Sequence, residues 1–366
     1  MKVKAAVLFA PHQPFEILDL DLREPGPGEV LVKIAAAGVC HSDYHLVSGA
    51  TKHPMPVVAG HEGAGIVEAI GAGVKDIAVG DHVILSWTPD CGRCFYCLRG
   101  KPNLCETFTA PIWAGVMLDG TTRLSLRGKP VYHYCGLASF ATHAVVPQES
   151  CVKASINVSL GVAALVGCAV ATGVGAAIYT SPIRPGESVV VYGAGGVGLS
   201  IVQGARLSGA KTIIAVDRTP AKMEIARKLG ATHSILSDDR TIENVRAATD
   251  DRGADHVFEA VGLASLQEAA LEAVRPGGTL VLAGLSPMGT PTNLPGAILT
   301  RKEITVKGSY YGSVHPRRDF PMLLDLYQAG RLDLDSLISR TFSLEQINQA
   351  YQEMLAGNLA RGVITF

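Results

Sequence analysis

Hydrophobic and polar positions in the second half of the chain alternate between short apolar runs and helical spacing. Residues 189–191 are all valine and follow a Pro-Gly turn, as is typical of a buried parallel strand. Apolar residues then recur at helical spacing as far as Gly209, and another apolar run, residues 213–216, ends in Asp217. This order of strand, helix and strand predicts a parallel α/β unit.

The first half of the chain has a different pattern. Residues 1–60 are predicted to be mostly β-structure, with a turn at residues 24–28 and a strand at residues 30–34. No charged residue occurs between Lys153 and Arg184, a length that hydropathy alone could assign to a membrane span. The stretch is rich in Gly, Ala, Ser and Thr, which gain little on entering lipid, so we predict buried helices and no membrane contact.

A glycine motif stands between the first strand and the helix of the α/β unit. Gly193, Gly195 and Gly198 fit the pattern G-x-G-x-x-G, and the acidic Asp217 follows about 20 residues later, as a dinucleotide fold requires. The first glycine permits a tight turn, the second lets the backbone approach a pyrophosphate, and the third allows close packing of helix and strand. The helix N-terminus would hold the phosphates. A glycine-rich turn that binds nothing is the alternative, and the complete context disfavours it.

Composition narrows the class of protein. A length of 366 residues predicts about two domains, and 48% hydrophobic with 18% charged residues indicates a globular chain. The net charge is -1 without a basic block, so nucleic acid and acidic membrane surfaces are poor partners. The N-terminal apolar run is too short for a secretory signal, so we expect a cytoplasmic protein. All eight cysteines lie at or before Cys168, and in such a protein metal ligation is a better interpretation than disulfides.

Four of these cysteines form a compact group. Cys91, Cys94 and Cys97 are spaced as C-x-x-C-x-x-C, and Cys105 follows in the same turn-rich segment. Four thiolates make the closed tetrahedral site that structural zinc prefers. An iron–sulfur cluster is the main competitor, but the Cys-Pro that ends many cluster-binding runs is missing. A redox pair or a disulfide knot is a further alternative.

A second group of candidate ligands is spread along the chain. Cys40 lies in GVCHSD, His61 lies in the glycine-flanked segment GHEGAG, and Cys168 lies in the uncharged stretch. Each alone could be an ordinary core or surface residue. Three protein ligands with one open position are the arrangement of catalytic zinc, but spacing does not show that these three meet.

The chain resembles the zinc-dependent medium-chain alcohol dehydrogenases over essentially its whole length. The shared landmarks, in order, are GVCHSD, GHEGAGIVE, the four-cysteine loop, DGTTR, GCAVATG, GAGGVG and VDRTPAKMEIARKLGAT. The resemblance implies an α/β protein with a GroES-like β catalytic domain, residues 1–169 and 312–366. A Rossmann domain with a doubly wound parallel sheet, residues 170–311, would bind NAD, and the active cleft would lie at their junction.

The resemblance also implies roles for individual residues and two zinc ions per subunit. It assigns the catalytic zinc to Cys40, His61 and Cys168, with Glu62 as the acid behind the metal. It assigns the structural zinc to Cys91, Cys94, Cys97 and Cys105. Ser42 and His45 match the proton relay that serves a zinc-activated alcohol. The implied cofactor contacts are His41, Gly193, Gly195, Gly198, Asp217, Arg218, Lys222 and Arg361. The implied substrate pocket contains Trp87, Tyr134, Cys135 and Leu285.

The expected reaction is hydride transfer between NAD and a primary alcohol or its aldehyde, with aromatic and medium-chain substrates included. Trp87 stands where many relatives have Phe, and its larger ring should crowd the pocket. Ser42 replaces the common Thr and, because it lacks the methyl group, leaves slightly more space. NAD should be preferred because Asp217 repels a 2′-phosphate, although Arg218 beside it could pair with that phosphate. The segment at residues 119–139 is of the type found in longer, dimeric members, so a homodimer is expected.

Three other functions compete with this prediction. The branch that uses a glutathione adduct, S-(hydroxymethyl)glutathione dehydrogenase, shares nearly every motif. It typically has acidic residues after Ser-Gly-Ala and an arginine four positions after the last structural-zinc cysteine, where this chain has Thr51-Lys52-His53 and Thr109. A non-catalytic structural protein that binds NAD and zinc would be favoured by a lost ligand, and none is lost. A zinc-free quinone reductase is disfavoured for the same reason.

Overall fold

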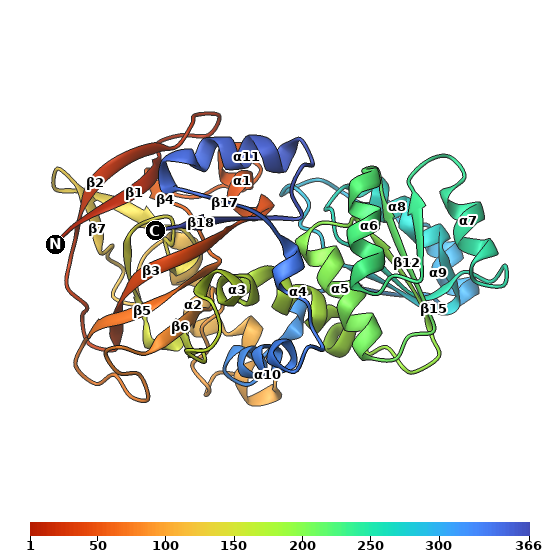
Figure 1. Ribbon diagram of the computed structural model, residues 1–366, viewed down its shortest axis with the longest axis horizontal. Coiled ribbons are helices and arrows are strands. Elements are labelled where there is room, and N and C mark those ends of the chain that lie inside the picture. Colours follow the sequence, from red (N-terminus) through yellow and green to blue (C-terminus); the bar gives the residue numbers. More distant parts are fainter. The chain divides into compact units, whose positions relative to one another are not determined.

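The computed structural model describes all 366 residues. The chain forms two compact units, one built from residues 1–168 and 315–366 and the other from residues 169–314. The first unit therefore contains both ends of the chain, as the red and dark blue ribbons show (Figure 1).

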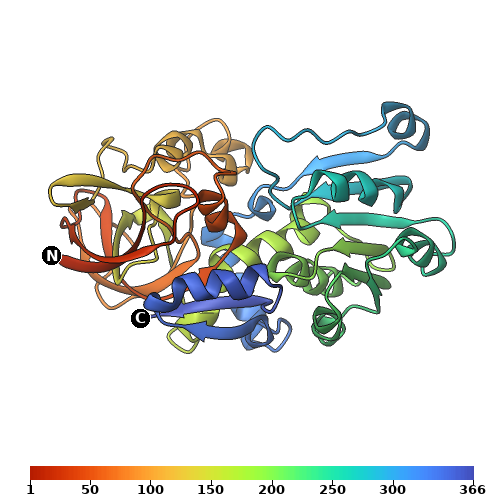
Figure 2. The same ribbon diagram turned by 90° about the horizontal axis from the view of Figure 1, so that it is seen from above.

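The first unit contains a closed β-barrel and a second sheet (Figure 2). The barrel order is β1 (Lys2–Leu8), β2 (Glu16–Leu22), β7 (Leu124–Leu126), β8 (Lys129–His133) and β4 (Val57–Val58). The sheet order is β10 (Cys151–Lys153), β6 (His82–Leu85), β5 (Gly63–Ile70), β3 (Glu29–Val39), β18 (Arg361–Thr365) and β17 (Ile338–Phe342), and β9 (His143–Pro147) also pairs with β3. Because β18 pairs antiparallel with the end of β3, the C-terminal segment returns to the segment that precedes Cys40.

The second unit contains a six-stranded, wholly parallel sheet. The order is β13 (His233–Leu236), β12 (Thr212–Asp217), β11 (Ser188–Tyr192), β14 (Ala254–Glu259), β15 (Val274–Leu282) and β16 (Thr305–Gly308). Numbered from β11, this is the order 3-2-1-4-5-6 of a doubly wound dinucleotide fold, with the chain reversing direction across the sheet between β11 and β14. The predicted strand-helix-strand unit is confirmed, because α5 (Gly196–Leu207) connects β11 to β12.

Helices complete both units. In the first unit these are α1 (His41–Val47), α2 (Glu106–Ala114), α3 (Leu160–Leu165), α10 (Pro316–Gln328) and α11 (Ile347–Leu355). In the second they are α4 (Ala171–Gly175), α5, α6 (Pro220–Leu229), α7 (Thr241–Ala247), α8 (Ala264–Glu272) and α9 (Gly296–Lys302). The mostly β-structure predicted for residues 1–60 is confirmed by β1 to β4, and helix α1 is the exception, because the ladder of β3 ends at Val39 and the backbone turns helical after Cys40.

The uncharged stretch forms the one helical segment that is long and apolar enough to cross a membrane, Leu160–Thr180. It contains α3, α4 and two π-helical turns, Val166–Val170 and Ala176–Thr180. Its most apolar window is 89% buried inside the protein. This burial is typical of a core helix, as the sequence predicted. Length and composition alone do not distinguish a core helix from a membrane-spanning helix.

Candidate metal centres and dinucleotide site

The structure brings Cys40, His61 and Cys168 together in the first unit. Their ligand atoms all lie within 4.8 Å of one another and all three residues are buried. Cys40 is the residue before helix α1, His61 lies between β4 and β5, and Cys168 lies on the π-helical turn after α3. Such turns interrupt helices frequently at functional sites. His61 Nε2 is 3.2 Å from Cys168 Sγ, so the two face each other.

The donor chemistry fits a divalent cation such as zinc. The hydrogen bond between the two cysteines lowers the pKa of Cys40 well below its usual value, against the effect of burial. The same hydrogen bond and burial raise the pKa of Cys168. A zinc ion requires both thiols to be deprotonated, so its binding would release protons. Two thiolates and an imidazole, with room for a fourth ligand, are a zinc donor set of the catalytic type.

Asp43 supports this group, and the sequence analysis assigned it no role. Its carboxylate is fully buried, with Oδ2 2.9 Å from His61 Nδ1, while Oδ1 accepts a hydrogen bond from Gly60 N at 2.8 Å. Although burial opposes it, this carboxylate and Cys40 raise the pKa of His61. Metal-binding histidines usually donate their second nitrogen to such a partner, which fixes the ring and leaves Nε2 facing the metal. The signal in the sequence was an acidic residue three positions after Cys40.

Glu62 and Arg361 form a buried charged pair beside the candidate ligands. Arg361 Nη2 is 3.7 Å from Glu62 Oε1, and Arg361 Nη1 donates to the carbonyl of Val39 at 3.0 Å. A Cβ at Gly38 would lie 2.1 Å from Glu62 Oε2, so only glycine leaves space for this carboxylate. The pKa of Arg361 is raised by Glu62 and Cys40 despite burial. The pair places a positive charge next to a predicted thiolate centre.

The predicted relay residues lie on helix α1. Ser42 Oγ is 3.8 Å from Cys40 Sγ, and the Tyr134 hydroxyl donates to the Ser42 carbonyl at 3.0 Å. Ser42 lies inside the helix and not at its cap, so the capping role usual for serine does not apply. His45 is half-buried, its Nδ1 is buried without a hydrogen-bond partner, and burial lowers its pKa.

Two of the four predicted pocket residues contact His61 directly. The rings of Trp87 and Tyr134 both meet the imidazole edge-to-face, with centroids 6.1 and 5.8 Å away. Cys135 is buried next to Tyr134, and burial raises the pKa of its thiol. Leu285 belongs to the second unit, where its side chain is 48% exposed. Its place in a pocket therefore stays a prediction.

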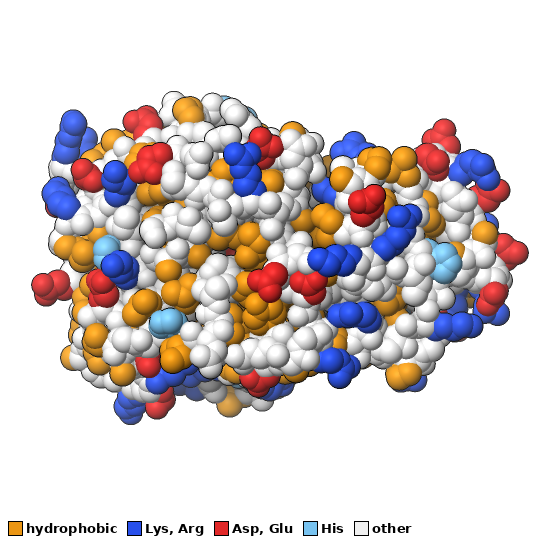
Figure 3. Space-filling view, viewed as in Figure 1, with side chains coloured by type: hydrophobic (Ala, Val, Ile, Leu, Met, Phe, Trp, Pro, Cys, Tyr) orange, Lys and Arg blue, Asp and Glu red, His pale blue; other side chains and the backbone are white.

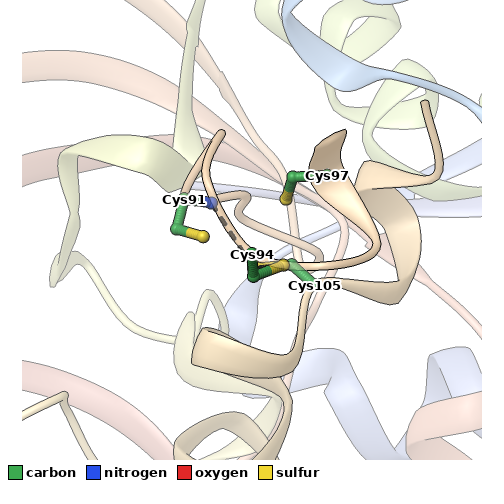
Figure 4. A group of neighbouring side chains, drawn as sticks. All are labelled: Cys91, Cys94, Cys97 and Cys105. Atoms are coloured by element: carbon green, nitrogen blue, oxygen red, sulfur yellow. Dashed lines mark hydrogen bonds between the residues drawn. The ribbon is translucent and has the colours of Figure 1, made fainter. Parts of the chain in front are cut away.

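The four-cysteine group also converges, as Figure 4 shows. The sulfur atoms of Cys91, Cys94, Cys97 and Cys105 all lie within 4.8 Å of one another. A hydrogen bond from the Thr107 hydroxyl at 3.2 Å, with nearby backbone N–H groups, lowers the pKa of Cys91 to about 6 although burial acts in the opposite direction. Three of the cysteines are half-buried, and all eight in the chain are free of disulfides. Four converging thiols fit a closed zinc site.

The glycines of the dinucleotide motif differ in what they accommodate. Gly193 has φ +96°, and a Cβ there would lie 2.5 Å from the Val261 side chain. A Cβ at Gly198 would lie 1.7 Å from the Gly193 carbonyl oxygen, so helix α5 approaches the turn too closely for any other residue. A Cβ at Gly195 would meet nothing within 4 Å. The open space at Gly195 fits the approach of a pyrophosphate, because packing within the protein does not require glycine there.

Asp217 ends strand β12 and connects the motif to the following segment. Its Oδ2 accepts a hydrogen bond from Ala194 N at 2.7 Å, and its Oδ1 accepts one from Thr219 N at 2.9 Å. Lys222 Nζ lies 3.9 Å from Asp217 Oδ2, and Arg218 is exposed. The carboxylate is thus held at the position where the ribose hydroxyls of NAD are recognised in such folds.

The remaining predicted cofactor residue, His41, is exposed at the start of α1.

On the face drawn in Figure 3, basic and acidic side chains are intermixed, and neither forms a broad single-sign surface. This distribution agrees with the net charge of -1.

Comparison with known proteins identifies the class to which this site belongs. Residues 26–156 match the alcohol dehydrogenase GroES-like domain family, and residues 196–329 match the zinc-binding dehydrogenase family. The chain therefore belongs to the zinc-dependent medium-chain alcohol dehydrogenases, as the motifs indicated. It is an NAD-dependent oxidoreductase, with zinc as its metal.

Individual relatives cover the whole chain. A putative alcohol dehydrogenase D of Mycobacterium tuberculosis is 44% identical over 100% of both chains. An S-(hydroxymethyl)glutathione dehydrogenase of Escherichia coli is 40% identical, also over 100% of both. The crystal structure of benzyl alcohol dehydrogenase from Acinetobacter calcoaceticus superimposes with a TM-score of 0.94 at 33% identity, covering 100% of this chain and 99% of that one.

Proposed function

We propose that this protein oxidises free primary alcohols with NAD and reduces the corresponding aldehydes. The observation that carries the proposal is the buried convergence of Cys40, His61 and Cys168 beside the Ser42 hydroxyl. It joins a three-ligand metal site to a group that can accept a proton. Aromatic and medium-chain alcohols are the substrates that the neighbouring rings favour.

Each ligand set would hold one zinc ion. Cys40, His61 and Cys168 would hold the catalytic zinc, and the four clustered cysteines would hold a structural one. Zinc bound at the first set supplies a Lewis acid that lowers the pKa of an alcohol. Asp43 would keep His61 in the tautomer with Nε2 toward the metal. Glu62 and Arg361 would balance the charge of the two thiolates.

The proton would leave along helix α1. Ser42 Oγ would accept the alcohol proton, and the hydrogen bond from Tyr134 to the Ser42 carbonyl would hold the helix in place for this transfer. The proton would then pass by way of the cofactor ribose toward His45, whose buried Nδ1 has no hydrogen-bond partner and whose ring is kept neutral because burial lowers its pKa. NAD, when bound, accepts the hydride.

The cofactor would lie on the second unit. Gly193, Gly195 and Gly198 would hold the pyrophosphate at the start of α5, and Lys222, beside Asp217, would be a further contact of the cofactor. Asp217 would accept hydrogen bonds from the ribose and repel a 2′-phosphate, since each carboxylate oxygen has lone pairs beyond those used by the backbone. NAD should therefore exceed NADP in kcat/KM by at least tenfold. Asp217→Ala should lower the ratio of kcat/KM for NAD to that for NADP, because Arg218 is then free to bind the 2′-phosphate. Equal use of both cofactors by the unmodified protein would contradict the proposed preference for NAD.

A free alcohol is favoured over a glutathione adduct by the residues at two positions. The position four residues after Cys105 is Thr109, whose hydroxyl donates to the Cys105 carbonyl at 2.7 Å and so is already used within its own helix. A hydroxyl does not replace an arginine in pairing with a carboxylate. The rings of Trp87 and Tyr134 beside His61 favour an apolar chain or ring as the substrate.

The test is a substrate panel with the zinc-loaded protein. Benzyl alcohol and octanol should be oxidised with NAD, and added glutathione should not increase the rate of formaldehyde oxidation. A strict glutathione requirement, with kcat/KM far above that of any simple alcohol, would assign the chain to the adduct-using branch instead. Absence of turnover with every substrate, with both zinc ions bound, would favour a non-catalytic role.

A homodimer in the cytoplasm completes the proposal. Strand β16 is at the edge of the parallel sheet, with most of its residues exposed, and such an edge can pair with a second copy. The eight free cysteines suit a reducing compartment. Light scattering of the purified protein should give twice the chain mass of 38.4 kDa.

A further inference from the structure

A buried carboxylate fixes a turn at the carboxyl end of strand β14, in the second unit. Glu259, the last residue of β14, is fully buried. Its Oε1 accepts hydrogen bonds from the backbone N–H groups of Val261 at 2.7 Å and Gly262 at 2.8 Å. Burial raises the pKa of this carboxyl, against the effect of these hydrogen bonds. The side chain thus determines the path of residues 260–262.

The same residue connects this turn to the one after β15. The Glu259 carbonyl accepts hydrogen bonds from Ala283 N and Gly284 N, both at 2.8 Å. A Cβ at Gly262, which has φ +88°, would lie 2.3 Å from the Leu285 carbonyl oxygen, and one at Gly284 would lie 2.1 Å from Gly262 N. The two backbones therefore touch. We call residues 260–262 and 283–285 the double turn.

Gln267 on helix α8 extends the hydrogen bonding to the longer loop that follows. Its Nε2 donates to Glu259 Oε2 at 3.3 Å and to Ser286 Oγ at 3.0 Å. Its Oε1 accepts from the Thr292 hydroxyl at 2.6 Å. Gln267 is also buried, at 3% exposure. One carboxylate and one amide therefore hold both segments that follow β14 and β15.

The position of the double turn relates it to the cofactor. In a sheet of this order the two halves each bind one mononucleotide, and ligands lie outside the carboxyl ends of the strands. Asp217 ends a strand of the first half, which leaves the ends of β14 and β15 to the second mononucleotide. Val261 packs against the Gly193 turn, and Val261 and Leu285 are 45% and 48% exposed although both are large and apolar.

We propose that Glu259 is a positioning residue for the nicotinamide half of the cofactor. By fixing the double turn, it holds two exposed apolar side chains, Val261 and Leu285, as a surface for the nicotinamide ring. The inference rests on NAD as the cofactor. Glu259 itself contacts only the protein, so its effect should appear in binding of the whole dinucleotide and be absent with ADP-ribose, which lacks the nicotinamide.

Calorimetric titration of the full-length, zinc-loaded protein with NADH and with ADP-ribose tests this. Glu259→Ala leaves the N–H groups of Val261 and Gly262 without their acceptor and should weaken NADH binding about tenfold. The Kd of ADP-ribose should change less than about twofold. Glu259→Gln keeps an oxygen acceptor for Val261 and Gly262 and should restore most of the NADH affinity. If Glu259→Ala does not fold, Gln267→Leu takes its place, with a smaller loss confined to NADH.

A matched control separates positioning from stability. Asp255, at the opposite end of the same strand, bonds to Ser188 and Arg275, so Asp255→Asn should lower the melting temperature and leave the ratio of the two Kd values unchanged. Equal losses for NADH and ADP-ribose in Glu259→Ala, or no loss for either, would overturn the inference. Failure of the unmodified protein to bind NADH would instead overturn the cofactor assignment, and the inference with it.

Discussion

The two cysteine sites of the first unit are built in opposite ways. All four thiols of the cysteine cluster come from residues 91–105, on a turn-rich segment that is only half-buried. The three ligands Cys40, His61 and Cys168 come from three separate elements and are all buried. A closed set of four thiolates leaves a zinc ion no position for a substrate, whereas three ligands leave one. Local spacing thus predicts the proposed structural site, whereas the ligands of the proposed catalytic site are brought together only by the fold of the whole unit.

The groups that support the two sites also differ in whether they are local or distant in the sequence. The cluster is supported by backbone N–H groups and the Thr107 hydroxyl, which are local to its segment. The buried site is supported by Asp43, and by Glu62 paired with Arg361, which comes from the last strand. Removing a ligand from each should therefore give different failures, and the following predictions test that difference.

The largest effect is expected from Cys168→Ala. Loss of one of three ligands should release the zinc of the buried site and cost several kcal/mol of transition-state stabilisation, on the order of a thousandfold in kcat/KM. The protein should remain folded, because the cluster is untouched. Alcohol oxidation measures the loss of activity, and circular dichroism measures whether the protein remains folded. Cys151→Ala, which changes a buried cysteine that belongs to neither site, is the control and should retain activity.

Cys94→Ala should act mainly on stability. Structural zinc contributes folding free energy, and a loss of about 3 kcal/mol corresponds to a fall of roughly 4 °C in melting temperature for a chain of this size. Below the new transition the remaining protein should turn over substrate, since the buried site is intact. A melting temperature equal to that of Cys151→Ala would show that the cluster does not stabilise the fold.

Asp43→Asn should give a smaller defect confined to the buried site. Removing the charge behind His61 should weaken zinc binding 10- to 100-fold, a typical effect for such partners. Competition with a chelator measures the affinity for each zinc. Asp319→Asn, another buried carboxylate of the first unit, should leave the affinity unchanged. Equal loss from both zinc sites would mean that Asp43 acts on the fold as a whole.

The smallest effect concerns acid stability away from both sites. His133 is buried, its Nε2 accepts a hydrogen bond from Arg123 N at 2.9 Å, and burial lowers its pKa to about 3. Between that value and about pH 6.5 the unfolded chain binds a proton that the folded chain does not. The contribution of neutral His133 to the free energy of unfolding is therefore present above pH 6.5 and is lost as the pH falls. It should remove roughly 1 kcal/mol between pH 6 and pH 5.

His133→Gln offers the comparison, because its side-chain oxygen can still accept from Arg123 and does not titrate. Urea unfolding at several pH values should show a shallower loss of stability in the variant. An unchanged slope would place the acid sensitivity elsewhere, with the thiolate sites as the next group to examine.

The sequence predicted those features that depend on neighbours along the chain. The strand, glycine turn and helix around Gly193 follow from periodicity and from the positions of the glycines, and the spacing of the four cysteines predicted one site. The resemblance joined Cys40, His61 and Cys168, which spacing alone left apart. No local pattern indicated that residues 41–47 turn helical, because that depends on where the ladder of β3 ends.

The supporting residues were missed for a related reason. Asp43 and Glu259 are acidic residues in unremarkable positions along the chain, and only folding shows that both are buried against particular partners. A charge becomes informative when it is removed from water, since a buried carboxylate must be paired or hydrogen-bonded. Burial is a property of the packed fold, so neither role could be inferred from composition or spacing.

The most direct test measures zinc content and alcohol oxidation on the same samples while a chelator removes metal in steps. We predict two zinc ions per chain at the start, with activity falling in proportion to the loss of one of them. In Cys168→Ala a single zinc and activity on the order of a thousandfold lower should be found from the outset. Full activity in protein that contains no zinc would contradict the assignment of the buried site.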